Sequence, residues 1–158
     1  MPDSSPVVIT PAELLAHWQG HRRVTRRTIE AFPDDKLFDF SIGGMRTFSA
    51  LVMEMVGMAA PTLQGVVNKT WDTSTTPTPT TKAELLALWD QTTGEIDRLW
   101  AQIPPARFQE VDTAFGQWTM PIHGLILYII DNEIHHRGQG TVYLRALGVE
   151  PPAFYDRS

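Results

Sequence analysis

Residues 122–139 read IHGLILYIIDNEIHHRGQ, an apolar run that fills abruptly with ionisable and amide side chains. The first half, Ile122 to Ile130, is apolar enough to lie in a protein core, so the polar half continues a buried helix and does not open a solvated tail. Polar groups in such a place need partners, because burying them unpaired costs free energy. This segment is therefore the first candidate for a functional site.

The helix that carries this segment is expected to run from about Pro121 to Leu147, where Gly148 supplies a stop. Tyr128, Asn132 and His136 are spaced four residues apart on it. Side chains with that spacing project from one face of a helix, and here the same face holds an apolar stripe. We expect all three polar side chains to point into the protein interior.

Three further amphipathic patterns precede this helix, and they cover about residues 11–32, 46–65 and 81–103. Four long helical patterns without a convincing alternating strand run predict an all-α four-helix bundle. The connections at 33–46 and 66–81 are long, which indicates crossovers and not tight hairpins. Neither side of the Thr- and Pro-rich stretch at 72–81 holds enough helices to close a core, so residues 1–158 are predicted to form a single domain.

The composition narrows the class of function. The chain has 158 residues, 42% of them hydrophobic, and its net charge of −5 comes with scattered basic residues, which argues against nucleic-acid binding. It has no cysteine, which excludes disulfides, thiolate metal ligands and a cysteine nucleophile. We find no signal peptide and no stretch that approaches the length of a membrane span, so we expect a cytoplasmic protein without a membrane partner.

Glu54 is the acid that best complements the polar run. It lies among large apolar residues on the core-facing strip of the second helix, where a carboxylate needs a cation, a metal or strong donors. Four-helix bundles build metal sites from inward residues on facing helices, and Glu54, Asn132 and His136 form such a three-ligand set. An amide oxygen is a weak, hard ligand, so this set should bind transition metals less tightly than three histidines would.

These residues resemble the DinB/YfiT-like superfamily of four-helix-bundle, metal-dependent proteins. The resemblance covers essentially the whole chain and rests on DNEIHHRGQ at 131–139, VYLRALG at 142–148, Pro151-Pro152 and Arg46-Thr47-Phe48. The usual site of the family has three histidines, one on the second helix and an H-x-x-x-H pair on the last. The matching positions here are Glu54, Asn132 and His136, so one histidine of the three is retained.

The resemblance implies a divalent transition metal (Zn, Ni, Fe or Mn) at this site, a homodimer, and either a hydrolase or a transferase that uses a small thiol such as mycothiol or bacillithiol. Two alternatives follow for this chain. In the first, a metal on Glu54, Asn132 and His136 acts as a Lewis acid or activates a bound nucleophile, with Tyr128 reaching the ligand from the site wall. In the second, the site is a metal-free polar network in a non-catalytic dimeric binding or stress-response protein. The anionic donor at position 54 favours the first.

Other conspicuous residues have structural interpretations. His135 lies one position off the inner face, so we expect it at the surface or behind a ligand. Arg137 is expected to pair with Glu133 across one turn. His17 and His21 have a spacing that suits metal ligation, but His21 can equally be a partly buried bundle residue. The tryptophans are expected to be core or interface anchors: Trp18, Trp71, Trp89, Trp100 and Trp118.

Overall fold

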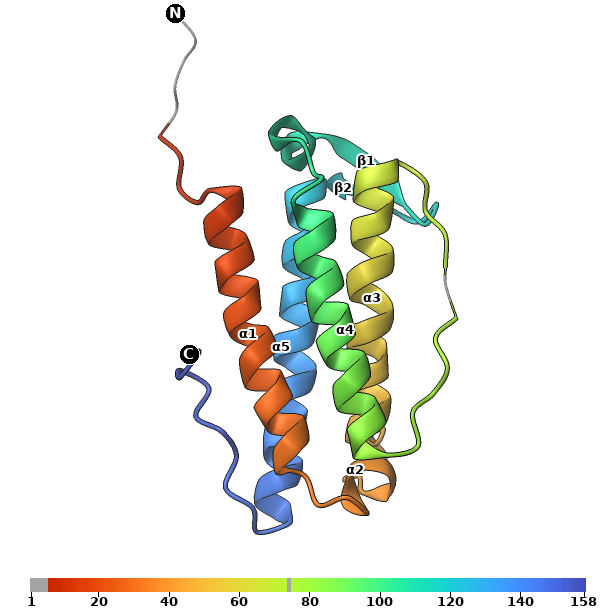
Figure 1. Ribbon diagram of the computed structural model, residues 1–158, viewed down its shortest axis with the longest axis vertical. Coiled ribbons are helices and arrows are strands. Elements are labelled where there is room, and N and C mark those ends of the chain that lie inside the picture. The colour runs from red at the N-terminus through yellow and green to blue at the C-terminus, as the bar shows by residue number, and fades with distance from the viewer. Residues whose placement is uncertain (1–5, 74) are drawn as a thin grey trace, which may run out of the picture.

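The computed structural model describes residues 6–73 and 75–158. Four long helices form an elongated bundle (Figure 1): α1 (Pro11–Ala31), α3 (Phe48–Asn68), α4 (Lys82–Trp100) and α5 (Ile122–Ala146). The shorter elements are α2 (Lys36–Asp39), the 3-10 turn η1 (Pro105–Gln109), β1 (Val111–Ala114) and β2 (Trp118–Pro121). The predicted all-α four-helix bundle is confirmed.

Capping boxes begin two of the long helices. At the start of α1, the backbone N–H of Glu13 donates to the Thr10 hydroxyl, and the Glu13 carboxylate accepts from the Thr10 N–H at 2.8 Å. Thr81 and Glu84 repeat this exchange at the start of α4. Such reciprocal bonds satisfy backbone donors that a helix leaves unpaired at its first turn, so both helices begin close to where the sequence predicts.

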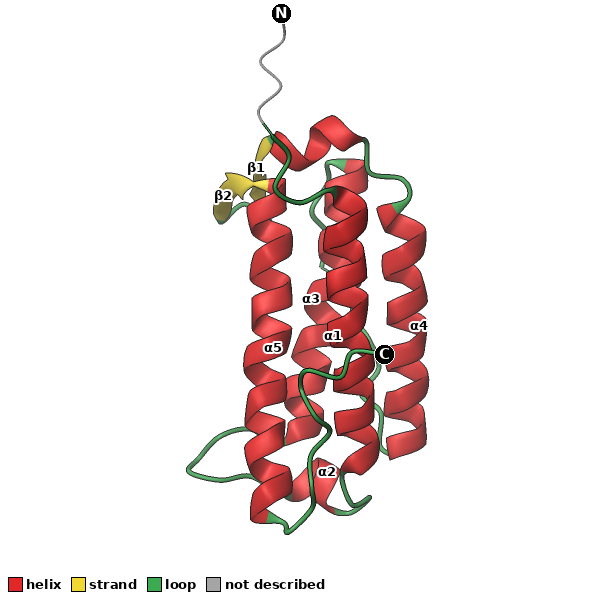
Figure 2. Ribbon diagram, turned by 90° about the vertical axis from the view of Figure 1, so that its left-hand side faces the viewer, coloured by secondary structure: helices red, strands yellow, loops and turns green. Residues whose placement is uncertain are grey.

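The helix order around the bundle shows two crossovers. α1 packs mainly against α4 and α5, and α3 packs against the same two helices. In Figure 1, α1 and α5 run in one direction while α3 and α4 run in the other, so the segment after α3 returns along the whole bundle before α4 begins. Figure 2 shows the C-terminal segment running back along α1. The long connections therefore cross over as predicted, although the short α2 within the first one was not expected.

A β-hairpin closes one end of the bundle, although we had found no convincing strand run in the sequence. β1 and β2 pair antiparallel, and Gln117 N–H donates to Ala114 C=O across the turn at 3.0 Å. Each strand has four residues, too few to give a readable alternation. The turn uses left-handed backbone at Phe115 (φ 52°) and Gly116 (φ 68°).

A close contact joins this hairpin to α3. A Cβ added to Gly65 would overlap the ring of Trp71, so the glycine lets the indole lie directly on the helix. Trp71 in turn contacts Phe115 at the hairpin turn, with ring centroids 5.5 Å apart. Aromatic contact of this kind holds the hairpin over the end of α3.

α3 corrects one expectation from the sequence. It is long and apolar enough to cross a membrane, whereas we had expected no segment of that length. Most of it is buried against α4 and α5 inside the bundle, as in the core helix of a globular domain. The tryptophans, expected to be core or interface anchors, have different environments. Trp18, Trp89 and Trp100 lie in the core, but Trp118 is 51% exposed.

Candidate functional site

The three residues predicted from the sequence lie together between α3 and α5. Glu54 Oε1 accepts hydrogen bonds from Asn132 Nδ2 at 3.0 Å and from His136 Nε2 at 2.9 Å. Its other oxygen, Oε2, lies 2.5 Å from Nη1 of Arg46, which precedes α3. We call these four residues the Glu54 cluster. At its centre, both oxygens of the Glu54 carboxylate contact side-chain N–H donors.

His136 is fixed from two sides. Its Nε2 faces Glu54, and its Nδ1 lies 2.8 Å from Oε1 of Gln139, one turn further along α5. The ring is buried, with an exposed side-chain fraction of 8%, whereas the Glu54 side chain is 30% exposed. His135 is exposed, as its position off the inner face predicts. The adjacent histidines therefore have different environments.

Opposing effects act on the pKa of Glu54. Burial by itself would raise the pKa of this carboxyl, but the hydrogen bonds from Asn132, His136 and Arg46 outweigh burial and lower it to about 2. Glu54 is thus ionised at neutral pH. The cation and the hydrogen-bond donors that a carboxylate in this place requires are therefore supplied by Arg46, Asn132 and His136.

The side chains do not fit a divalent metal in this arrangement. Nε2 of His136 is engaged by the Glu54 carboxylate, whereas a metal-bound imidazole nitrogen must be free to bind the ion. Asn132 presents its NH₂ group to Glu54, and Arg46 already supplies a positive charge to this carboxylate, so a metal ion would have to displace both groups. One feature points the other way, since Oδ1 of Asn132 is buried and has no hydrogen-bond partner within residues 6–73 and 75–158.

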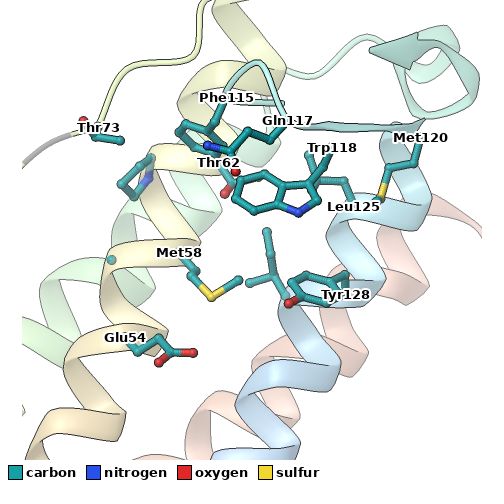
Figure 3. Close-up of a pocket in the computed structure, with 13 residues that line it drawn as sticks. Glu54, Met58, Thr62, Thr73, Phe115, Gln117, Trp118, Met120, Leu125 and Tyr128 are labelled. Carbon is teal, nitrogen blue, oxygen red and sulfur yellow. The ribbon is translucent and has the colours of Figure 1, made fainter. Parts of the chain in front are cut away.

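A pocket of about 510 Å³ lies beside the Glu54 cluster, between α3, α5 and the hairpin. Figure 3 shows Glu54 and Tyr128 at the end of the pocket away from the hairpin, with Phe115 and Gln117 at the other end and Trp118 between them. The lining is mostly apolar: Glu54, Gly57, Met58, Pro61, Thr62, Thr73, Phe115, Gln117, Trp118, Met120, Leu125, Tyr128 and Ile129.

Sequence reasoning misplaced or missed several residues here. Tyr128 was expected inside the bundle, but it is 56% exposed and lines the pocket from its edge. Arg46 had been noted without a role at the site, since it precedes the helix and no periodicity links it to Glu54. Trp118 was expected to be a core or interface anchor, but it lines the pocket. A Phe-Gly turn flanked by a tryptophan was the available signal for the hairpin.

A second polar cluster lies on the side of α5 that faces α1, and it overturns the predicted Arg137–Glu133 pair. Glu133 accepts from Trp18 Nε1 at 3.1 Å and from Thr25 Oγ1 at 2.8 Å, and it lies 3.6 Å from Nη1 of Arg22. We call this group the Glu133 cluster. Because these partners surround the carboxylate, Arg137 bonds to α1 instead.

Arg137 donates to His21 at two places, the backbone carbonyl at 3.2 Å and the ring Nδ1 at 3.0 Å. His21 is buried, and burial, followed by the nearby charge of Arg137, lowers its pKa to about 3. Its ring lies edge-on to that of His17 at 4.6 Å. No cluster of three or more His, Asp or Glu side chains suited to a metal ion occurs in the described part of the chain, so this pair has no carboxylate to complete a site.

A four-helix bundle with long crossovers and a polar cluster between its second and last long helices defines a DinB-like protein. The chain belongs to the DinB family, whose family model matches residues 1–158. It is similar to the crystal structure of a DinB-like protein from Bacillus cereus ATCC 10987, at 20% identity over 91% of this chain and 97% of that one, with a TM-score of 0.74.

It is also similar to a DinB-like protein from Bacillus subtilis, at 18% identity over 89% of this chain and 96% of that one, with a TM-score of 0.71. At these identities the likeness is one of fold. No curated protein matches the chain.

Proposed function

We propose that this protein binds a small, mostly apolar molecule in the pocket between α3, α5 and the hairpin. The Glu54 cluster forms the polar end of that pocket, and Arg46 supplies there the positive charge that a metal would otherwise bring. The contact between Arg46 and Glu54 at 2.5 Å carries the proposal, because it neutralises the carboxylate without an ion from outside.

The pocket has the features of a small-molecule site. Its volume of about 510 Å³ lies within the range of ligand pockets, roughly 300–1,000 Å³. Its wall is apolar apart from a few polar groups, and such groups fix the orientation of a ligand. The carboxylate of Glu54 is held by three donors and is therefore positioned before any ligand arrives.

Filling the pocket tests the binding function. Gly57 lines the pocket, and a Cβ added there meets no atom within 4 Å, so Gly57→Leu should fold and occupy the space. Gly94→Leu on α4 is the matched control, because its Cβ also meets nothing within 4 Å. We expect the neutral probe 4-phenyl-1-butanol to bind the wild type and Gly94→Leu in calorimetric titrations, and not Gly57→Leu. Equal binding to all three proteins, or to none, would overturn the proposal.

Metal analysis tests whether Arg46, and not a metal ion, supplies the positive charge beside Glu54. Protein purified without a histidine tag is compared with the Glu54→Ala/His136→Ala double variant. Equal, near-zero metal in both supports a metal-free cluster. Stoichiometric metal in the wild type alone would replace this proposal with a metal-dependent hydrolase or thiol transferase. The observation that favours a metal is Oδ1 of Asn132, which has no hydrogen-bond partner among the described residues.

A further inference from the structure

We propose that the pocket selects an apolar molecule that ends in an ammonium group, a lipophilic amine, and that this ammonium replaces the Arg46 guanidinium on Glu54. The inference rests on the proposed function and adds the charge of the ligand. Three observations carry it: the charge of the pocket wall, a backbone acceptor on α3, and the aromatic rings around the cavity.

The wall of the pocket carries a single formal charge. Among the lining residues of the described chain, Glu54 is the one that bears a full charge at neutral pH, and the remainder are apolar or neutral polar side chains. Arg46 and His136 bond to Glu54 but do not line the pocket. Once Arg46 has moved away, a carboxylate ligand would meet a like charge at the polar end, whereas an ammonium would meet an opposite one.

Arg46 is suited to being displaced. Its side chain is 53% exposed and it precedes α3, so the guanidinium can move into water without opening the bundle. An exposed ion pair contributes little net stability, since each partner is well solvated when apart. A ligand cation that also buries an apolar body in the pocket gains hydrophobic stabilisation that Arg46 does not.

A second acceptor lies on α3 next to Glu54. Pro61 is inside this helix and has no N–H, so the carbonyl of Gly57 lacks the donor that a regular helix would provide four residues later. Both Gly57 and Pro61 line the pocket. An ammonium has three N–H donors, and it can use this carbonyl together with a Glu54 oxygen.

Aromatic rings surround the remaining space. Phe115, Trp118 and Tyr128 line the pocket (Figure 3), and aromatic faces attract organic cations as well as apolar groups. Phe115 adopts φ 52°, a left-handed conformation that is unfavourable for a bulky side chain. Its ring contacts Trp118 at 6.2 Å between centroids. The strained turn thus places an aromatic ring at the hairpin end of the cavity.

Three probes with one apolar body test the charge preference: 4-phenylbutylamine, 4-phenyl-1-butanol and 4-phenylbutyrate. We expect the amine to bind the wild type about tenfold more tightly than the alcohol, and the carboxylate to bind most weakly. Glu54→Gln should abolish the preference for the amine over the alcohol. Arg46→Gln should strengthen amine binding, because the competing guanidinium is gone. Calorimetric titration measures each affinity, and melting curves check that each variant is folded.

The outcomes separate this inference from the proposed function. Binding of the alcohol with no preference for the amine would overturn the inference and leave the pocket as a binding site. An amine preference that survives Glu54→Gln, or amine binding that weakens in Arg46→Gln, would also overturn it. If none of the three probes binds, both proposals fail together.

Discussion

Glu133 on α5 and Glu54 on α3 are carboxylates that each lie beside an arginine, yet they differ in access to solvent. Glu133 is 2% exposed and is enclosed by α1, whereas the Glu54 side chain is 30% exposed and borders the pocket. Asn132 and His136 face Glu54, while the neighbouring positions 133 and 137 face α1. One residue of offset, about 100° around a helix, thus separates a closed structural cluster from an open one.

The largest expected effect is the loss of charge in the closed cluster. Glu133→Gln keeps the shape of the side chain but leaves the positive charge of Arg22, which is 1% exposed, buried without its anion. Breaking a buried pair by removing one partner costs about 3–5 kcal/mol. We expect a loss of unfolding free energy of that size in urea titrations.

Glu54→Gln is the matched control for that substitution. It removes the same charge from a carboxylate whose arginine partner is 53% exposed, so we expect a loss of about 1 kcal/mol or less. Equal losses in the two variants would break the distinction between a closed and an open cluster.

As the pH falls, the stability that comes from the buried contacts between α5 and α1 should be lost first. The pKa of His21 is about 3 in the folded protein against an ordinary 6.5, so folding favours the neutral ring. Its contribution is complete above pH 6.5 and falls as the pH drops toward 3, because the unfolded chain takes up the proton first. At about 1.4 kcal/mol per pH unit, we expect a loss of about 2 kcal/mol by roughly pH 4.5.

The unfolding free energy is measured by urea titration at a series of pH values for the wild type and for His21→Gln. The variant has no titratable side chain at position 21. The variant should show the smaller pH dependence between roughly 6.5 and 4.5. Glu54 acts over a lower range, since its contribution is present above pH 4.5 and disappears as the pH falls toward 2. Identical pH profiles for the two proteins would show that His21 does not govern this range.

Adjacent histidines provide a smaller test on the open side. His136→Ala removes a buried ring that bonds to Glu54 and Gln139, and we expect it to lower the unfolding free energy by about 1–2 kcal/mol. His135→Ala removes an exposed ring and should change it by less than about 0.5 kcal/mol. A larger loss in His135→Ala than in His136→Ala would contradict the assignment of inner and outer faces.

Features that depend on short stretches of sequence, such as helix caps and helical periodicity, could be predicted. The caps at Thr10 and Thr81 and the four long helices follow from patterns within each segment. The meeting of Glu54 with Asn132 and His136 follows from the inward faces of two helices in a bundle. Arg46 and Phe115 were missed, since their positions depend on a loop and on a strained turn that no periodicity encodes. The crossovers followed from loop length alone.

Arg137 illustrates a second reason for failure. Spacing placed it one turn from Glu133, and an ion pair across that turn was a sound prediction for an exposed helix. Inside the bundle, however, α1 supplies Trp18 and Thr25 to the carboxylate and His21 to the guanidinium. Tertiary partners therefore replaced the local pair, and the sequence of α5 alone could not reveal them.

The smallest expected effect comes from a chelator. If Arg46 neutralises Glu54, EDTA should leave the melting temperature of untagged protein unchanged. A metal bound to the native state at one hundred times its dissociation constant would add about 2.7 kcal/mol, and its removal would lower the melting temperature by several degrees. Glu54→Ala separates the two cases, because without the carboxylate a chelator has no site to empty. A drop in the melting temperature of the wild type that disappears in Glu54→Ala would place a cation other than Arg46 on this carboxylate. The Glu54 cluster would then differ from the Glu133 cluster in the source of its positive charge as well as in its access to solvent.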